Sequence, residues 1–127
     1  MPKTVLVVDD QEPVVELVGA ALESAGYRVL KAYGCDGGLQ ILSENGRTDL
    51  ILSDILMGNP DGYIFIERAR ETGYRGKVIF MSGLDNREEA MRHRADGYLR
   101  KPFKGGIKML LTIVGDIIGE AGPPETT

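Results

Sequence analysis

Cysteine and histidine are nearly absent from this sequence, with one residue of each among 127. The single cysteine, Cys35, leaves no disulfide framework and no cluster of thiolates for a metal. We expect it to be a small buried or half-buried side chain. The single histidine, His93, excludes a metal site built from histidines. It stands in the charged stretch MRHRAD, so we expect it to face solvent rather than to act in catalysis.

Long hydrophobic runs and basic clusters are also missing. No stretch approaches the roughly 18 apolar residues that a membrane-spanning helix needs. The opening residues MPKTVLVVDD lack the pattern of a secretory signal, so we expect a cytoplasmic protein with no membrane partner. The net charge is −4 without a stripe of Lys or Arg, which argues against direct binding of nucleic acid. Neither G-x-x-x-x-G-K-[ST] nor G-x-G-x-x-G follows the first apolar run, so nucleotide binding is not expected either.

Five apolar runs alternate with five segments of helical periodicity. The content of 43% hydrophobic and 27% charged residues is ordinary for a globular protein, and 127 residues suffice for one core. We predict strands over 4–8, 28–32, 50–53, 77–81 and 97–99, and helices over 14–25, 36–45, 64–72, 88–94 and 107–118. The first helix should bury an apolar face made of Val14, Leu17, Val18, Ala21, Leu22 and Ala25.

This alternation predicts an α/β fold, a parallel sheet with helices on both faces. We place a single domain over residues 1–120. The remaining residues, 121–127, have no periodic pattern and are expected to form a flexible tail or the start of a linker.

Polar side chains stand at the carboxyl ends of four predicted strands: Asp9 and Asp10, Asp54, Ser82, and Lys101. Ligands of open parallel sheets bind beyond this edge. Two unit charges ~4 Å apart repel by roughly 4 kcal/mol at an effective dielectric near 20, so three acids there need a cation. Mg²⁺ is the common hard ion that takes oxygen ligands and handles phosphates. A carboxylate nucleophile, a metal ion, an ammonium and a hydroxyl together suit phosphoryl transfer.

Simpler interpretations exist for the same side chains. Asp9 or Asp10 could cap the first helix, and Asp54 could be a turn residue. Lys101 could be one of many solvated lysines.

The sequence resembles the receiver domain of two-component response regulators over nearly its whole length. The resemblance rests on VLVVDD, LILSDILM, the pair Asp61-Gly62, VIFMSG and ADGYLRKPF, which occur in this order. It implies a flavodoxin-like, doubly wound sheet of strand order 2-1-3-4-5, and a signalling module rather than an enzyme. It also implies a phosphoryl donor that is a histidine kinase or a histidine phosphotransferase, and a downstream protein that the sequence does not name.

The resemblance assigns roles to the residues at the strand ends. It implies that Asp54 is the phospho-acceptor, and that Asp10, Asp54 and the backbone carbonyl of Leu56 bind Mg²⁺. Asp9 would assist through a water molecule. Lys101 would contact the acyl phosphate.

Two further residues would form the switch. Ser82 would move to bond a phosphoryl oxygen, and Tyr98 would swing inward with it, although a static, half-buried ring is the simpler interpretation of Tyr98. The bond between Lys101 and Pro102 is expected to be cis.

The sequence departs from the family pattern around these residues. Gly58, Asn59 and Pro60 follow Met57, where the family usually has proline directly. Ser82 stands where threonine is commoner, and the interval from there to the site lysine is about one helical turn shorter than usual.

That shortening predicts a short fourth helix. Its only clear apolar anchors are Ala90 and Met91, followed by Ala95, so we expect local mobility. Leu56 and Leu84 occupy positions whose side chains help to place the hydrolytic water in the family, which predicts slow self-dephosphorylation.

Two other functions remain open. A degenerate receiver would act through constitutive protein binding without phosphorylation. A Mg²⁺-dependent phosphohydrolase with an aspartyl nucleophile would use the same edge, but it expects D-x-D after the first strand, where this sequence has Asp9-Asp10-Gln11.

Overall fold

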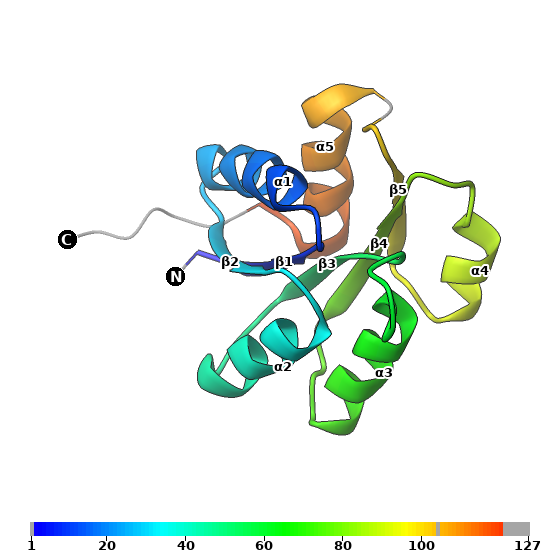
Figure 1. The fold of residues 1–127 in the computed structure, drawn as a ribbon. Coiled ribbons are helices and arrows are strands. Elements are labelled where there is room, and N and C mark those ends of the chain that lie inside the picture. Colours follow the sequence, from blue (N-terminus) through cyan, green and yellow to red (C-terminus); the bar gives the residue numbers. More distant parts are fainter. Residues whose placement is uncertain (1, 104, 121–127) are drawn as a thin grey trace.

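A five-stranded parallel sheet lies between two layers of helices in the computed structural model, which describes residues 2–103 and 105–120 (Figure 1). The strands are β1 (Thr4–Val8), β2 (Arg28–Ala32), β3 (Leu50–Asp54), β4 (Lys77–Ser82) and β5 (Gly97–Arg100). The helices are α1 (Glu12–Ser24), α2 (Cys35–Glu44), α3 (Gly62–Glu71), α4 (Arg87–Arg92) and α5 (Gly106–Ile118). The strand order is β2-β1-β3-β4-β5 and every neighbouring pair is parallel. The predicted α/β fold and the strand order implied by the resemblance are therefore confirmed.

Each face of the sheet has its own hydrophobic core. α1 and α5 cover one face, and α2, α3 and α4 lie on the other (Figure 1). The central strands β1 and β3 are buried along their whole length because their side chains meet helices on both sides. Cys35 is buried at the start of α2, as predicted.

The strands run slightly further than the sequence pattern indicates. β3 includes Asp54, β4 includes Ser82 and β5 includes Arg100, because parallel pairing continues to these residues. Asp54 and Ser82 therefore stand on the last residues of their strands, whereas Asp9 and Lys101 directly follow β1 and β5. The predicted tail over 121–127 lies outside the described residues.

The apolar face of α1 is narrower than predicted. Leu17 is 53% exposed, so its assignment to the buried face is wrong. The helix packs against β2 and α5 and buries Val18 and Leu22 between them, whereas Leu17 borders an open hollow at the carboxyl edge of the sheet. Ala25 follows the last helical residue and is exposed.

Helix α4 has only six residues, which confirms a short fourth helix. Ala90 is its one buried side chain, and Ala95 is buried just beyond it. Met91 is 43% exposed, so its prediction as an anchor is wrong: in a helix of fewer than two turns, only one side chain points inward. His93 is exposed, as predicted, and its ring stacks on Tyr63 with centroids 3.9 Å apart and planes at 10°.

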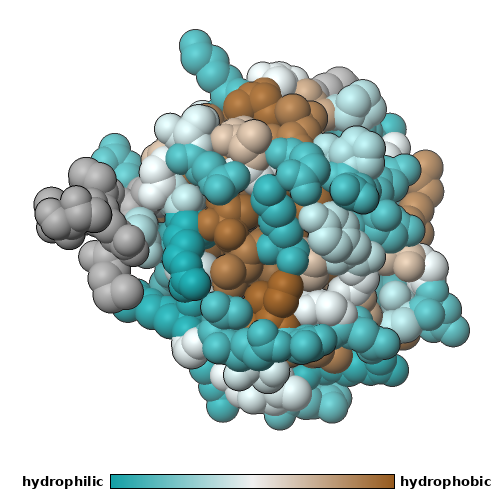
Figure 2. Space-filling view, turned by 60° about the vertical axis from the view of Figure 1, so that its left-hand side comes forward, coloured by the Kyte–Doolittle hydropathy of each residue, from teal (hydrophilic) through white to brown (hydrophobic). Residues whose placement is uncertain are grey.

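The outer strand β2 is less well covered than the central strands. Figure 2 turns the left-hand side of Figure 1 forward and shows a hydrophobic strip flanked by hydrophilic side chains. Arg28 is exposed, and the next three residues of β2 are partly exposed. Lys31 in this strand forms an ion pair with Glu16 of α1 at 2.9 Å. Across residues 2–103 and 105–120, no helix has the length and hydrophobicity required to cross a bilayer.

Candidate functional site

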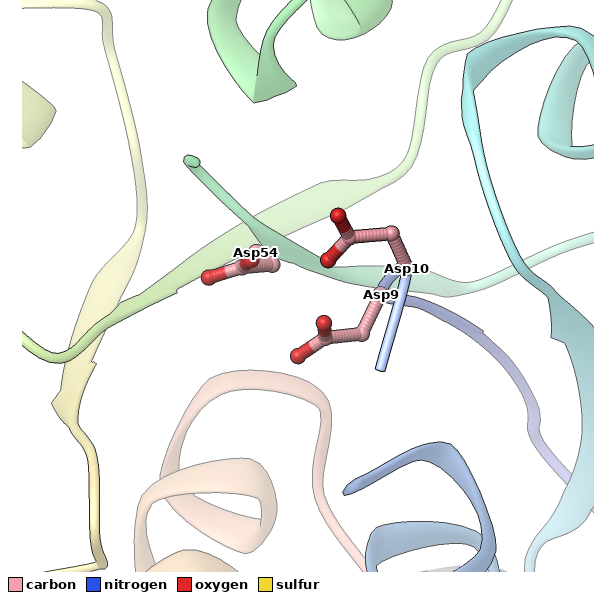
Figure 3. Close-up of side chains that lie close together, drawn as sticks. All are labelled: Asp9, Asp10 and Asp54. Atoms are coloured by element: carbon pink, nitrogen blue, oxygen red, sulfur yellow. The ribbon is translucent and has the colours of Figure 1, made fainter. Parts of the chain in front are cut away.

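Three carboxylates converge at the carboxyl edge of the sheet. β1 and β3 are neighbours, with Val8 opposite Ser53, so the residues that follow these positions lie side by side. Figure 3 shows Asp9, Asp10 and Asp54 gathered around a common space, and one carboxylate oxygen from each lies within 4.8 Å of the others. Asp9 and Asp54 are buried, at 0% and 3% exposure, whereas Asp10 is exposed. The cluster thus has a buried floor and one open side.

Lys101 joins two of these carboxylates. Its Nζ lies 2.9 Å from Asp9 Oδ2 and 3.2 Å from Asp54 Oδ1, and its side chain is only 14% exposed. The backbone N–H of Lys101 donates to the carbonyl of Ser82 at 2.7 Å, which ties the segment after β5 to the end of β4. The peptide bond to Pro102 is cis, as the resemblance implies. The interpretation of Lys101 as a solvated lysine is therefore wrong.

The surroundings change the acidity of these groups. Burial raises the pKa of Asp54 to about 6, with the charge of Asp9 adding to the rise and the ammonium of Lys101 opposing it. Burial acts to lower the pKa of Lys101, but the hydrogen bond that its ammonium donates to Asp9 and the charges of both carboxylates outweigh it and raise that pKa. When all four groups are ionised, the three carboxylates and the Lys101 ammonium give the site a net charge of about −2. An all-oxygen set with that charge and one open side fits a hard divalent cation.

Helix capping does not explain the acids after β1. The residue at the N-cap position of α1 is Gln11, just before the helix, and its side chain makes no cap hydrogen bond. Asp9 Oδ1 accepts from the backbone N–H of Gln11 at 2.9 Å, which holds the turn but caps no helix. Pro13 lies in the first turn, where its missing N–H costs nothing. The cap interpretation of Asp9 and Asp10 is wrong.

The pair Asp61-Gly62 starts α3 close to the site. Asp61 Oδ1 accepts from the backbone N–H of Ile64 at 2.9 Å and so caps the helix. A Cβ added at Gly62 would lie 2.1 Å from the backbone oxygen of Asp54, so only glycine lets α3 approach the end of β3 this closely. In the preceding loop, the bond between Asn59 and Pro60 is cis.

Ser82 and Tyr98 both contact the loop between β4 and α4. Ser82 is fully buried, and its Oγ accepts from Leu84 N and Asn86 Nδ2, each at 3.1 Å. The Tyr98 hydroxyl donates to the carbonyl of Leu84 and accepts from the backbone N–H of Asn86 at 3.1 Å. The Tyr98 ring is 7% exposed, so it already points inward, and the half-buried interpretation is wrong. The role of either residue as a switch stays a prediction.

A family model described as the response regulator receiver domain matches residues 5–113. The chain belongs to this family. The match covers all five strands except the first residue of β1, and it includes the site residues at their carboxyl ends.

Similar proteins include both regulators and a kinase. The receiver domain is 32% identical over 102 residues to the transcriptional regulatory protein DltR of Streptococcus agalactiae, covering 78% of this chain and 45% of DltR. It is 35% identical over 119 residues to the sensor kinase CckA of Brucella abortus, covering 91% of this chain and 12% of CckA. The crystal structure of a response regulator receiver protein from Burkholderia phymatum superimposes with a TM-score of 0.80 at 32% identity, covering 95% of this chain and 98% of that one. The chain thus spans half or less of these two curated relatives.

Two exposed leucines lie near the site of the receiver domain. Leu56 and Leu84 are 55% and 56% exposed. Leu56 lines an open hollow of about 670 Å³ together with Asp10, Asp54 and Lys101. Residue Leu84 belongs to the loop that holds the Ser82 hydroxyl.

Two polar side chains near the site were missed by the sequence reasoning. Gln11 Oε1 lies 3.5 Å from Lys101 Nζ at the rim of the hollow. Asn86 donates to Ser82. Adjacency to Asp10 was the available signal for Gln11, whereas an asparagine just before a helix ordinarily predicts a cap, which hides the contact that Asn86 makes.

Proposed function

We propose that this receiver domain accepts a phosphoryl group on Asp54 from a histidine kinase or a histidine phosphotransferase. The supporting observation is the placement of Asp54: a buried carboxylate on the last residue of β3, 3.2 Å from the ammonium of Lys101 and beside two further carboxylates. Such a group is rigidly positioned and faces the open hollow.

Mg²⁺ fits the donor set. Asp10, Asp54 and the backbone carbonyl of Leu56 would hold the ion, and Asp9 would act through a water molecule. When bound, the ion neutralises the charge that develops on the transferring phosphoryl oxygens. Asp10 is the exposed member of the cluster, which leaves room for the water that Mg²⁺ retains.

The side chains of this protein supply the remaining chemistry. The Asp54 carboxylate forms the new P–O bond as the P–N bond of the donor phosphohistidine breaks, and the electron pair returns to the donor imidazole. With a pKa of about 6, Asp54 is mainly ionised and nucleophilic at neutral pH. The Lys101 ammonium stabilises the phosphoryl oxygens, and the hydroxyl of Ser82 turns to bond one of them.

Labelling with acetyl phosphate tests this proposal. Wild type in Mg²⁺ is expected to gain one phosphoryl group by intact mass, and Asp54→Ala none. Asp36→Ala, which changes an exposed aspartate on α2, serves as the matched control and should label like wild type.

If wild type gains no phosphoryl group from acetyl phosphate or from a phosphohistidine donor, the proposal is refuted and the degenerate receiver is favoured. Continuous hydrolysis of free phosphate esters would favour the phosphohydrolase.

The output is proposed to be contact with a downstream protein, switched through Ser82 and Tyr98. The net charge of −4 and the lack of a run of Lys or Arg in the sequence argue against direct binding of nucleic acid. DltR and CckA both extend well beyond the part that this chain matches, so the downstream partner of this chain is a matter for experiment.

A further inference from the structure

The hydroxyl of Ser82 is engaged by the loop that follows β4. Its oxygen accepts from the N–H of Leu84 and from the side-chain amide of Asn86. A serine hydroxyl has two acceptor positions and one donor, so both acceptor positions are filled. Within residues 2–103 and 105–120, Ser82 Oγ makes no hydrogen bond with Asp54 or Lys101. The proposed bond to a phosphoryl oxygen on Asp54 would use the remaining donor of the hydroxyl, and a turn about the Cα–Cβ bond, away from the loop, would bring Oγ toward Asp54.

Asn86 is the residue that would lose its partner in this turn. It occupies the N-cap position just before α4, where an asparagine normally accepts through its side-chain oxygen from an N–H two or three residues ahead. Here it makes no such bond, and its backbone lies at φ −108° and ψ 21°, outside the extended conformation of a cap. With its amide on Ser82, Asn86 leaves the first turn of α4 uncapped.

The rest of α4 has little to hold it. Among its six residues only Ala90 is buried, and short helices draw their stability from packing. The Tyr98 hydroxyl bonds the backbone of Leu84 and Asn86, so it fixes the loop but not the first turn of the helix. The hydrogen-bond partner of the Asn86 side chain therefore strongly affects the stability of α4.

We propose that Asn86 is a positioning residue that exchanges partners on phosphorylation. In the unmodified protein its amide holds Ser82. Once Ser82 turns to a phosphoryl oxygen on Asp54, the carboxamide is released, accepts from the N–H of Glu88 or Glu89, and caps α4. This inference rests on the proposed function, since it needs phosphorylation of Asp54 as its trigger. The exchange of partners would couple phosphorylation of Asp54, at the edge of the sheet, to the ordering of α4 on the surface.

Amide hydrogen exchange at Glu88 and Glu89, followed by NMR, tests the exchange of partners. Wild type is compared without and with excess acetyl phosphate and Mg²⁺, with phosphorylation measured by mass. We expect exchange of at least one of these two amides to slow about fivefold on phosphorylation, the effect of a typical cap. Asn86→Ala can neither bond Ser82 nor cap α4, so its exchange at Glu88 and Glu89 should not slow when it is phosphorylated to the same extent.

A second pair of variants needs no phosphorylation. Asn86→Asp can cap a helix but has no N–H for Ser82, so its α4 should be protected already in the unmodified protein. Ser82→Ala frees the amide of the native Asn86 and should do the same.

The outcomes separate this inference from the proposed function. Phosphorylated wild type whose Glu88 and Glu89 amides exchange as before would overturn the inference and leave the proposed function intact. Unmodified Asn86→Asp and Ser82→Ala that both exchange like unmodified wild type would overturn it as well. Failure of Asp54 to label refutes the proposed function and the trigger, while these two variants still decide whether the bond to Ser82 keeps α4 uncapped.

Discussion

The carboxyl of Asp54 is expected to destabilise the metal-free protein at neutral pH, and Asp54→Asn to relieve this. Its pKa rises from 3.8 to about 6 on folding, because of burial and then the neighbouring charge of Asp9. The unfolded chain therefore releases this proton at a lower pH than the folded protein. As the pH rises from about 4 to about 6, stability is lost, and the loss is complete above the folded pKa.

The magnitude follows from the difference of about two pKa units. Each unit corresponds to 1.36 kcal/mol, so ionised Asp54 lowers the free energy of unfolding by about 3 kcal/mol at pH 7. This value includes the attraction of Lys101, which opposes the rise. Asparagine has nearly the same shape and no charge, so Asp54→Asn should gain about 2 to 3 kcal/mol at pH 7 and only about 0.5 kcal/mol near pH 4.

Urea denaturation with a chelator, repeated between about pH 4 and pH 7, measures this difference. Asp36→Asn, at an exposed site on α2, should stay within about 0.5 kcal/mol of wild type throughout. Saturating Mg²⁺ should raise the stability of wild type and have little effect on Asp54→Asn. A gain that is independent of pH, or a loss of stability at pH 7, would refute the account of the buried carboxylate.

Three further predictions concern the metal, the lifetime of the phosphoryl group and the mobility of α4. Asp10→Ala should weaken Mg²⁺ binding on the order of tenfold or more in a titration, and unchanged binding would rule out its role as a ligand. The phosphoaspartate should decay slowly, and Leu56→Asn or Leu84→Glu should shorten its lifetime roughly ten- to hundredfold by placing a water; a lifetime unaltered in both variants would contradict this. In unmodified protein, amides of residues 86–94 should exchange much faster than those of residues 17–25, because α4 buries a single side chain; equal protection would show that α4 is well packed.

The sequence was sufficient to predict the fold and the membership of the acidic site. Apolar runs such as 4–8 and 50–53 are continuous because both of their faces are covered, and this pattern is local. Carboxyl ends of parallel strands share one edge, so Asp9, Asp54 and Lys101 could be brought together before any coordinates were known. The family resemblance added the strand order and the cis bond after Lys101.

Exposure of single side chains on helices was predicted less well. Leu17 and Met91 fit an apolar periodicity, yet both are exposed. Periodicity defines a stripe on a helix but not its width, which depends on what the neighbouring elements cover. Leu17 lies beyond the edge of α1 that β2 and α5 cover, and Met91 lies on a helix too short to turn a second residue inward.

Only the tertiary structure decided how the polar groups are paired. Lys101 reaches Asp9 across 92 positions of sequence, a contact that follows from the register of the sheet. The pKa of Asp54 depends on burial that the covering elements produce. Asn86 has the position of a helix cap in the sequence and instead holds Ser82, because the short loop brings its amide to an acceptor. Local pattern thus determined which residues meet at the edge, while the choice among competing hydrogen-bond partners depended on distances of a few ångströms that only the packed chain defines.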